Sequence, residues 1–402
     1  MKQEIIKRQR YIDQVKKSLD TEFIKVITGV RRSGKSYLLR MIKDLILEQG
    51  VSDSQIIFMN FENPEFFTIN TYEKLYDYLK EQISSTEKLY FLFDEIQEVE
   101  GWQKLINGLR VAYDCDIYIT GSNASLLSGE LATYLTGRYI EIKMHPLSFR
   151  EFLEFKGADT SSGPRFVKEY LEFGGFPSVV PQNDDALKAD VLSGIYNSIL
   201  LKDVTQRAHV KEPEILERVA NYLLDNIGQL VSTNKIANTI RSTGRKISNS
   251  TVESYLSLLE DSFLFYKATR YDIRGKERLK NQAKYYTVDL GFIMSQLRKI
   301  NSNRGARVEN LIYLELRRRG YDVFVGKYDS KEIDFVASKF DQTLYIQVTD
   351  RLPETSTRET DNLLHLPTGH KKIVITNSWD DVGMIEGIEI IHLNDFLLQG
   401  DV

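Results

Sequence analysis

The sequence of 402 residues predicts an α/β protein that begins with a parallel sheet covered by helices on both faces. Three observations predict this class. Short apolar runs alternate with helical patterns up to about residue 155, mostly helical patterns follow to about residue 300, and mixed patterns fill the remainder. Strands separated by helical crossovers form parallel sheets. The two changes of pattern, near residues 155 and 300, predict three domains, at 1–155, 156–300 and 301–402.

Each expected strand of the first region is a short apolar run rich in β-branched and aromatic residues. These runs are Phe23–Thr28, Ile56–Phe61, Leu89–Phe93, Ile117–Thr120 and Tyr139–Met144. Each expected helix is amphipathic, as Ser36–Gln49 is before its stop at Gly50. The other helices are Tyr72–Ile83, Trp102–Tyr113 and Leu126–Tyr134.

The second region follows a polar segment at Gly157–Gly163, and a turn signal at Gly174–Pro177 precedes its helices. A glycine-containing turn joins the last two helices, and a β-hairpin comes after them. The helices are Leu187–Lys202, Pro213–Ile227, Thr233–Ile240 and Asn249–Glu260, and the hairpin strands are Phe263–Tyr271 and Ala283–Val288. A helix-turn-helix followed by a β-hairpin is the outline of a winged helix.

The third region is expected to form a small α/β domain. A helical pattern is followed by five strand patterns that alternate with polar turns. The helix is Val308–Arg318, and the strands are Asp322–Gly326, Glu332–Ala337, Thr343–Val348, Lys371–Thr376 and Ile388–Ile391.

Composition excludes several classes of protein. With 42% apolar and 27% charged residues, the chain is not wholly disordered. No apolar run approaches the ~18–20 residues of a membrane span, and no apolar segment follows the basic N-terminus, so we expect a cytoplasmic protein without a membrane partner. Cys115 is the single cysteine, which excludes an internal disulfide and a multi-cysteine zinc cluster.

Charge is unevenly placed along the chain. The net charge is −4, yet residues 241–284 hold ten Lys or Arg against five Asp or Glu. Such a basic segment is a candidate contact for nucleic acid, and a solvated charged wing and loop is the alternative. If the segment binds DNA, phosphate contacts are expected from Arg241, Arg245, Lys246, Arg274, Lys276 and Arg278.

A phosphate-binding loop is predicted between the first strand and the helix that follows it. The residues Gly29-Val30-Arg31-Arg32-Ser33-Gly34-Lys35-Ser36 match the pattern G-x-x-x-x-G-K-[ST] in the required strand–loop–helix context. The glycines allow the backbone N–H groups and the helix N-terminus to face an anion. Lys35 is expected to reach the β- and γ-phosphates, and the Ser36 hydroxyl to ligate Mg²⁺.

Two acidic residues end the buried strand Leu89–Phe93. Asp94 is expected to hold Mg²⁺, directly or through water, and Glu95 to polarise the attacking water. The strand ending at Thr120 is expected to lie between these two elements, and Asn123, or else Ser122, to sense the γ-phosphate. An ordinary polar loop is the alternative for that segment.

Arg138 follows the next helix, where an arginine finger completes a neighbouring site in an oligomer. A homo-oligomer is therefore a candidate assembly, and a surface ion pair is the alternative role for Arg138.

These motifs resemble those of the AAA-superfamily ATPases of bacteria and archaea that carry a restriction-endonuclease-like C-terminal domain. The resemblance covers nearly the whole chain, because further motifs follow the Asp94-Glu95 strand in the same order. They are Thr120–Asn123, Leu135–Arg138, His145–Phe152, Gly174–Pro177, Leu201–Val204, Tyr255-Leu256, Tyr285–Gly291 and Glu332–Phe335. The resemblance implies ATP and Mg²⁺ as cofactors and a PD-(D/E)XK-type nuclease domain at 301–402.

That nuclease-like domain is expected to be degenerate. Glu309 matches the helix acid and Asp334 the first strand acid, but Gln347 and Thr349 replace the second acid and the lysine. A neutral amide is a poor Mg²⁺ ligand, and threonine supplies no cation. A displaced cation at Lys331 or Arg351 is the alternative that would preserve nuclease chemistry.

The leading hypothesis is an Mg²⁺-dependent ATPase whose nucleotide state moves the winged-helix and nuclease-like modules, with DNA as a candidate ligand. One rival is an ATP-gated nucleic-acid-binding or defence-type switch with little turnover. Another rival is a metal-dependent DNA nuclease.

Overall fold

The computed structural model describes residues 6–83, 87–127, 137–206, 208–298, 303–352 and 358–400. The chain forms two compact units, one of Met1–His145 with Asp261–Phe263 and the other of Pro146–Glu260 with Leu264–Val402. Most of the helix expected at Leu126–Tyr134 lies outside the described residues. Within them, no helix combines the length and apolar character needed to cross a bilayer.

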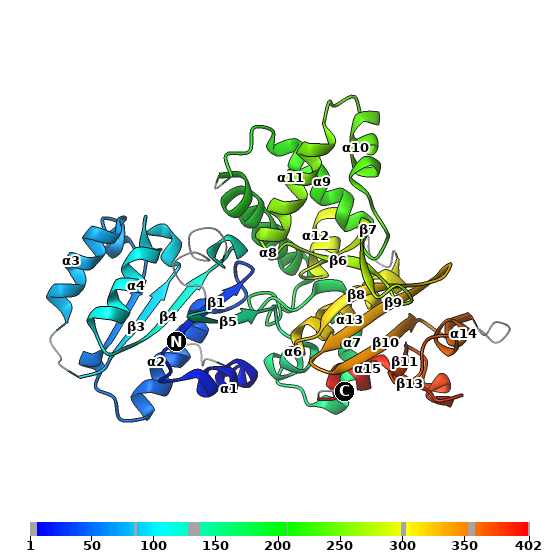
Figure 1. Ribbon diagram of the computed structural model, residues 1–402, viewed down its shortest axis with the longest axis horizontal. Coiled ribbons are helices and arrows are strands. Elements are labelled where there is room, and N and C mark those ends of the chain that lie inside the picture. The colour runs from blue at the N-terminus through cyan, green and yellow to red at the C-terminus, as the bar shows by residue number, and fades with distance from the viewer. Residues whose placement is uncertain are drawn as a thin grey trace. The chain divides into compact units, whose positions relative to one another are not determined.

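The first unit is built on a five-stranded parallel sheet, as the sequence predicts (Figure 1). Its strands lie in the order β2-β3-β4-β1-β5, so β4 separates β1 from β3 as expected. All four neighbouring pairs are parallel. The strands are β1 (Ile24–Gly29), β2 (Ile56–Asn60), β3 (Leu89–Asp94), β4 (Cys115–Gly121) and β5 (Tyr139–Met144).

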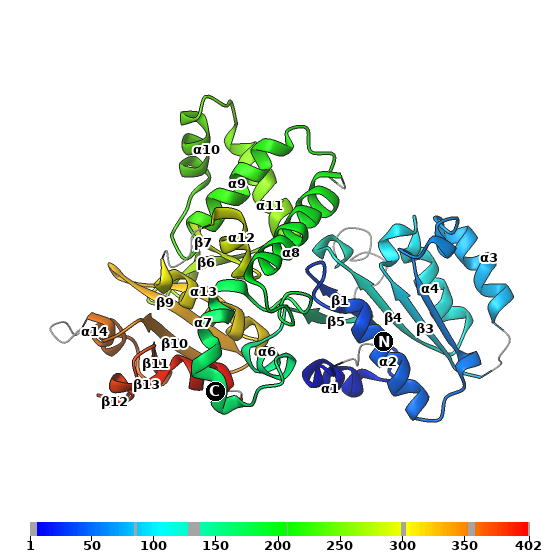
Figure 2. The same cartoon turned by 180° about the vertical axis from the view of Figure 1, so that it is seen from behind.

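Helices cover both faces of this sheet (Figure 2). On one face, α3 and α4 pack apolar residues such as Leu75 and Ile106 against Phe91 of β3. On the other face, α1 and α2 bury Val15 and Leu39 against the same sheet. The helices are α1 (Gln9–Ser18), α2 (Lys35–Glu48), α3 (Tyr72–Gln82) and α4 (Trp102–Ala112).

A buried ion pair joins two strands near the amino end of the sheet. Lys25 of β1 and Asp116 of β4 lie 2.5 Å apart with fully buried side chains, and the Tyr118 hydroxyl donates to the same carboxylate at 2.9 Å. Buried charges are tolerated when they are paired and hydrogen-bonded in this way. The candidate site lies at the opposite end of the strands, where the carboxyl ends of β1, β3 and β4 are neighbours.

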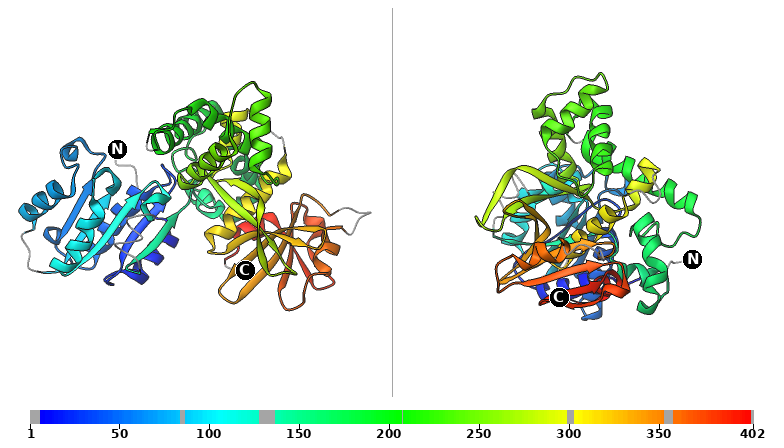
Figure 3. Two further views of the ribbon diagram at one scale, coloured as in Figure 1. Left: turned by 45° about the horizontal axis from the view of Figure 1, so that its top comes forward. Right: turned by 90° about the vertical axis from the view of Figure 1, so that its right-hand side faces the viewer.

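The second unit combines helices with a mixed sheet (Figure 3). The helices predicted in its first half are present with small shifts of their ends, and α6, α7 and α12 are additional to them. The helical segments are α6 (Phe149–Phe155), α7 (Gly163–Phe173), α8 (Asp185–Ser198), a π-helix (Ile199–Gln206), α9 (Pro213–Asp225), α10 (Thr233–Ser242), α11 (Asn249–Asp261), α12 (Gly291–Leu297), α13 (Arg304–Arg318), α14 (Arg358–Leu364) and α15 (Leu393–Leu398).

The sheet of this unit has eight strands in the order β12-β13-β11-β10-β9-β8-β6-β7. The predicted hairpin forms its edge, because β6 pairs in parallel with β8 through Arg270–Asp272. The hairpin is therefore continuous with the sheet of the third region, and the division into three domains stays a prediction. The strands are β6 (Phe265–Asp272), β7 (Glu277–Thr287), β8 (Asp322–Tyr328), β9 (Lys331–Lys339), β10 (Gln342–Thr349), β11 (Lys371–Thr376), β12 (Gly383–Ile385) and β13 (Ile388–His392).

Candidate functional site

The loop between β1 and α2 contains two glycines whose conformation or surroundings exclude a side chain. Gly29 has φ 141°, and a Cβ there would lie 2.1 Å from the carbonyl oxygen of Met144. Gly34 has φ 104° at the N-cap of α2. A side chain at Gly29 would collide with the neighbouring strand, and left-handed backbone at Gly34 favours glycine. Both glycines of the sequence motif are thus required by the shape of the loop.

Lys35 is enclosed by this loop. Its side chain is only 3% exposed, and Nζ donates to the carbonyl oxygens of Gly29 at 3.1 Å and Val30 at 3.3 Å. The same nitrogen lies 3.7 Å from Oε1 of Glu95. The ammonium group therefore stands between the loop backbone and the acidic end of β3, rather than in the apolar core.

The other loop residues differ in exposure. Val30 and Ser33 are buried, whereas Arg32 is exposed with φ 68°. Arg31 pairs with Glu62 at 2.9 Å. All eight motif residues lie in one continuous turn from β1 into α2.

Asp94, at the end of β3, is hydrogen-bonded by side chains of β2, β4 and α2. Its Oδ1 accepts a hydrogen bond from Thr120 Oγ1 at 2.6 Å, and its Oδ2 accepts one from Asn60 Nδ2 at 2.8 Å. The Ser36 hydroxyl also hydrogen-bonds this carboxylate. Burial raises the pKa of Asp94, and the Thr120 and Ser36 hydrogen bonds oppose that rise. The network holds the carboxylate beside the first turn of α2.

Glu95 adopts an unusual backbone conformation just beyond β3. Its φ and ψ are 56° and 48°, in the left-handed region, which costs a non-glycine residue roughly 1–2 kcal/mol. The Glu95 N–H donates to Thr120 Oγ1 at 2.9 Å, and the Gln97 amide donates to Glu95 Oε2. Backbone strain at one polar residue, held by neighbouring contacts, is a recurrent feature of functional sites.

The donor set at this edge fits a magnesium ion. The Ser36 hydroxyl and the Asp94 carboxylate are adjacent hard oxygen ligands, and Mg²⁺ is usually held by one or two such groups with the remaining positions taken by water and phosphate. Ser36 and Asp94 are the two residues that the sequence predicts as metal ligands.

Four residues of this site were not predicted. Thr120, Asn60 and Gln97 contact the two acids directly, and their signal is a polar side chain at or just after a strand end. Arg8 donates to the Ser33 carbonyl at 3.0 Å and to the His145 carbonyl at 2.9 Å. Because Arg8 is 25 and 137 residues from these partners, no local motif could have identified it.

The role of Asn123 or Ser122 as a sensor of the γ-phosphate and that of Arg138 as an arginine finger stay predictions. Asn123 and Ser122 are buried just beyond β4.

Arg138 is exposed, and its Nη1 donates to Asn107 Oδ1 at 3.1 Å. Its carbonyl accepts from the Ile24 N–H, which places Arg138 at the amino end of β1. That end is roughly 17 Å from the phosphate loop at ~3.3 Å per residue, so Arg138 lies far from the loop of its own chain.

The second unit brings together most of the nuclease-like residues. The Asp334 N–H donates to Gln347 Oε1 at 3.4 Å, and the Val348 N–H donates to Asp334 Oδ2 at 2.8 Å. Burial and the nearby Glu309 raise the pKa of Asp334 to about 8. Thr349 instead donates its hydroxyl hydrogen to the carbonyl of Arg351.

Neither alternative cation is placed at these acids. The exposed Arg351 lies 4.0 Å from Asp380, and Lys331 is half-buried at the start of β9. Among the described residues, no three His, Cys, Asp or Glu side chains are arranged as a metal site.

The predicted phosphate-contacting residues fall on two separate turns. At the turn between α10 and α11, Arg241 donates to the Ile247 carbonyl and to Asn238 and Asn249, and Arg245 pairs with Glu214 at 3.0 Å. At the hairpin, Arg274 pairs with Asp329, Lys276 has φ 54°, and Arg278 lies over the Phe324 ring. Arg241 thus closes the helix–helix turn itself.

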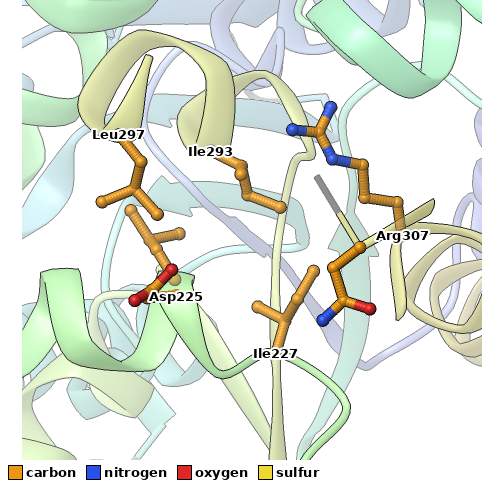
Figure 4. Close-up of a pocket in the computed structure, with 7 residues that line it drawn as sticks. Asp225, Ile227, Ile293, Leu297 and Arg307 are labelled. Atoms are coloured by element: carbon orange, nitrogen blue, oxygen red, sulfur yellow. The ribbon is translucent and has the colours of Figure 1, made fainter. Parts of the chain in front are cut away.

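A small pocket of about 180 Å³ also lies in the second unit. Ile227, Ile293 and Leu297 form its aliphatic wall, with Arg307 beside them (Figure 4). Burial lowers the pKa of Arg307, and the nearby Glu172 opposes that shift. None of the predicted site residues lines this pocket.

Comparisons with known proteins relate the chain to a domain family and to two uncharacterised proteins. Residues 21–153 match a family described as an AAA domain, and residues 165–304 match a domain of unknown function (DUF8612). An uncharacterised protein of Haemophilus influenzae is 51% identical over 99% of this chain and all of its own length. The chain belongs to the same family as that protein.

A second family relative extends the match to archaea. An uncharacterised protein of Methanocaldococcus jannaschii is 31% identical over 88% of this chain and 80% of its own length. Among solved structures, a Walker-type ATPase of Pyrococcus abyssi is similar in fold, with a TM-score of 0.52 and 17% identity over 74% of this chain and 97% of its own. This chain thus combines an AAA domain with a following domain of unknown function.

Proposed function

We propose that this protein binds ATP with Mg²⁺ and hydrolyses it. The observation that carries the proposal is the convergence of Lys35, Ser36, Asp94 and Glu95 at the carboxyl edge of one parallel sheet. Water attacks the γ-phosphoryl group, and catalysis is mainly positioning and charge stabilisation. A cation, two hard oxygen ligands and a second carboxylate are the groups that this reaction requires.

Each residue has a defined task in this proposal. The loop N–H groups and Lys35 bind the phosphates, and on binding the Lys35 ammonium exchanges its carbonyl contacts for phosphate oxygens. Ser36 and Asp94 would hold Mg²⁺, whose positive charge would stabilise the charge that develops on the phosphates. Glu95 accepts a proton from, or orients, the attacking water. Thr120 positions both acids through its hydroxyl, and Asn123 is the candidate sensor.

ATP hydrolysis is expected to drive a movement of the second unit. We propose that α10, α11 and the β6–β7 hairpin act as a winged-helix module and that residues 301–402 act as a nuclease-like module without nuclease activity. In the rival form of this proposal, ATP is a conformational ligand and turnover is incidental.

Glu95→Gln should lower ATP turnover by about 10²–10⁴-fold, the usual contribution of a general base, and leave ATP binding intact. The amide keeps the size of the side chain but neither accepts a proton nor carries charge. Steady-state phosphate release and ATP-analogue binding measure the two effects. Glu98→Gln, an exposed neighbour on the same turn, is the matched control.

A variant that keeps normal turnover would remove Glu95 from the mechanism. A Glu95→Gln protein that loses turnover but keeps full biological output, measured once a cellular phenotype is found, would favour the conformational switch. It would argue against a movement driven by ATP hydrolysis.

A second candidate function is nucleic-acid binding by the second unit. The observation favouring it is the exposed run Arg245, Lys246, Ser248, Asn249 and Ser250, which joins α10 to the first turn of α11. Side chains that donate hydrogen bonds at the start of a second helix suit contacts to phosphates and bases.

Replacing Arg245, Lys246 and Lys276 together with Glu should weaken binding to duplex DNA of any sequence. Three lost phosphate contacts should also reduce the slope of log affinity against log salt by roughly 3. Arg241 is left unchanged because it closes the turn. Fluorescence anisotropy across salt concentrations measures both effects, with Arg165, Lys168 and Lys371 changed to Glu as the control. If the unmodified protein does not bind duplex DNA at about 50 mM salt, the proposed nucleic-acid binding is wrong and these residues have only a structural role.

A further inference from the structure

A buried lysine lies among the acids of the nuclease-like region. Nζ of Lys284, on β7, is 2.9 Å from Glu309 Oε1 of α13, 3.0 Å from Glu332 Oε1 of β9 and 4.0 Å from Asp334 Oδ1 of β9. The Lys284 side chain is 4% exposed. One cation thus has three carboxylates around it, and two of them, Glu309 and Asp334, are the acids that match the nuclease motif.

The path of β7 brings this lysine to the cluster. In the sheet, β7 is an edge strand, and two strands separate it from β9. However, β6 pairs with β8 only through Arg270–Asp272, and the other end of the hairpin packs on α13. Tyr286, two residues beyond Lys284, donates its hydroxyl hydrogen to Glu309 Oε1 at 2.6 Å and stacks on Tyr313 of α13. Lys284 therefore points into the cluster from a strand that the nuclease motif does not include.

Several oxygens of the cluster already accept hydrogen bonds from protein donors. Asp334 Oδ2 accepts the Val348 N–H, and Gln347 Oε1 accepts the Asp334 N–H. Glu309 Oε1 accepts from both Lys284 and Tyr286. Mg²⁺ and Mn²⁺ are usually coordinated by about six oxygen atoms in octahedral geometry. A neutral amide is a weak substitute for a carboxylate among these ligands. With Lys284 in place among the acids, the residues present do not fit a divalent metal.

We infer that the Lys284 ammonium occupies the position that a divalent metal would take among Glu309, Glu332 and Asp334, so this region carries its own resident cation. Buried carboxylates are stabilised by a nearby cation, and Lys284 supplies that positive charge without an exchangeable ion. The cluster is a fixed link between β7, α13 and β9. The inference stands independently of ATP hydrolysis, because all of these residues belong to the second unit.

The test measures Mn²⁺ binding by the full-length chain. Calorimetry reports the affinity, and the electron paramagnetic resonance signal of free Mn²⁺ reports how much of the ion is unbound. Asp94→Asn is included throughout to weaken the proposed metal site of the phosphate loop. The parent with this change should bind no Mn²⁺ at the cluster. Adding Lys284→Ala should raise Mn²⁺ binding at the cluster from none to one ion per chain, because the carboxylate charge then lacks the ammonium.

Two further variants sharpen the result. Lys284→Arg retains a cation and should bind no Mn²⁺, and Lys284→Ala with Asp334→Asn should lose the new site. Stoichiometric Mn²⁺ binding by the parent that disappears with Asp334→Asn would overturn the inference, as would a folded Lys284→Ala protein without a new site. Should Lys284→Ala fail to fold, the parent measurement decides alone, since Mn²⁺ binding that requires Asp334 contradicts a resident ammonium.

Discussion

Lys35→Ala should weaken ATP binding by roughly tenfold or more and slow ATP hydrolysis by a larger factor. Charge-assisted hydrogen bonds contribute about 1.5–3 kcal/mol each, and 1.4 kcal/mol is a factor of ten in affinity. The same ammonium stabilises charge that develops during phosphoryl transfer, so turnover should fall by a further factor on the order of 10²–10³. Calorimetric titration with an ATP analogue and phosphate-release kinetics measure the two losses separately.

Folding should survive this substitution. Lys35 contacts the carbonyls of Gly29 and Val30 and lies near Glu95, rather than packing in either core of the first unit. Thermal unfolding should therefore stay close to that of the unmodified protein. Lys43→Ala removes a lysine of the same helix that pairs with Asp53 and serves as the control. Hydrolysis at the unmodified rate by Lys35→Ala would refute ATP turnover at this loop.

Arg138→Ala should bind ATP almost normally and hydrolyse it far more slowly. An arginine finger contributes on the order of 10³–10⁵ in rate where it has been measured. Arg138 lies at the amino end of the sheet, away from the phosphate loop of its own chain, so any such role is played in a neighbouring subunit. Specific activity should then rise with protein concentration as the assembly forms.

Mixing two inactive variants tests this trans arrangement. In an assembly that contains both Arg138→Ala and Lys35→Ala chains, some interfaces combine an intact loop with an intact arginine, and part of the activity should return. Arg40→Ala, a change of another exposed arginine in the same unit, should have little effect. Activity independent of concentration, with no recovery on mixing, would make Arg138 a surface residue that holds Asn107.

Local pattern was sufficient for most of the elements. The strands of the first unit lie within two residues of their predicted ends, because each is a short apolar run bounded by polar or glycine residues. α1 and α7 were not predicted. α1 has only four buried residues among charged ones, and α7 begins at Gly163, inside a segment that looks like a loop. Packing partners, rather than propensity, specify such helices.

The phosphate loop was determined by the sequence itself, because its glycines, Lys35 and Ser36 are consecutive and their geometry is set by one strand-to-helix turn. Asp94 and Glu95 were placed equally well as the polar end of a buried strand. Tertiary structure alone decided that Thr120 and Asn60 hold Asp94, that Arg8 clamps the loop, and that Lys284 enters the cluster of Glu309 and Asp334. These partners come from separate strands and helices, and their distances depend on sheet order and on the path of the β6–β7 hairpin, which no local periodicity encodes.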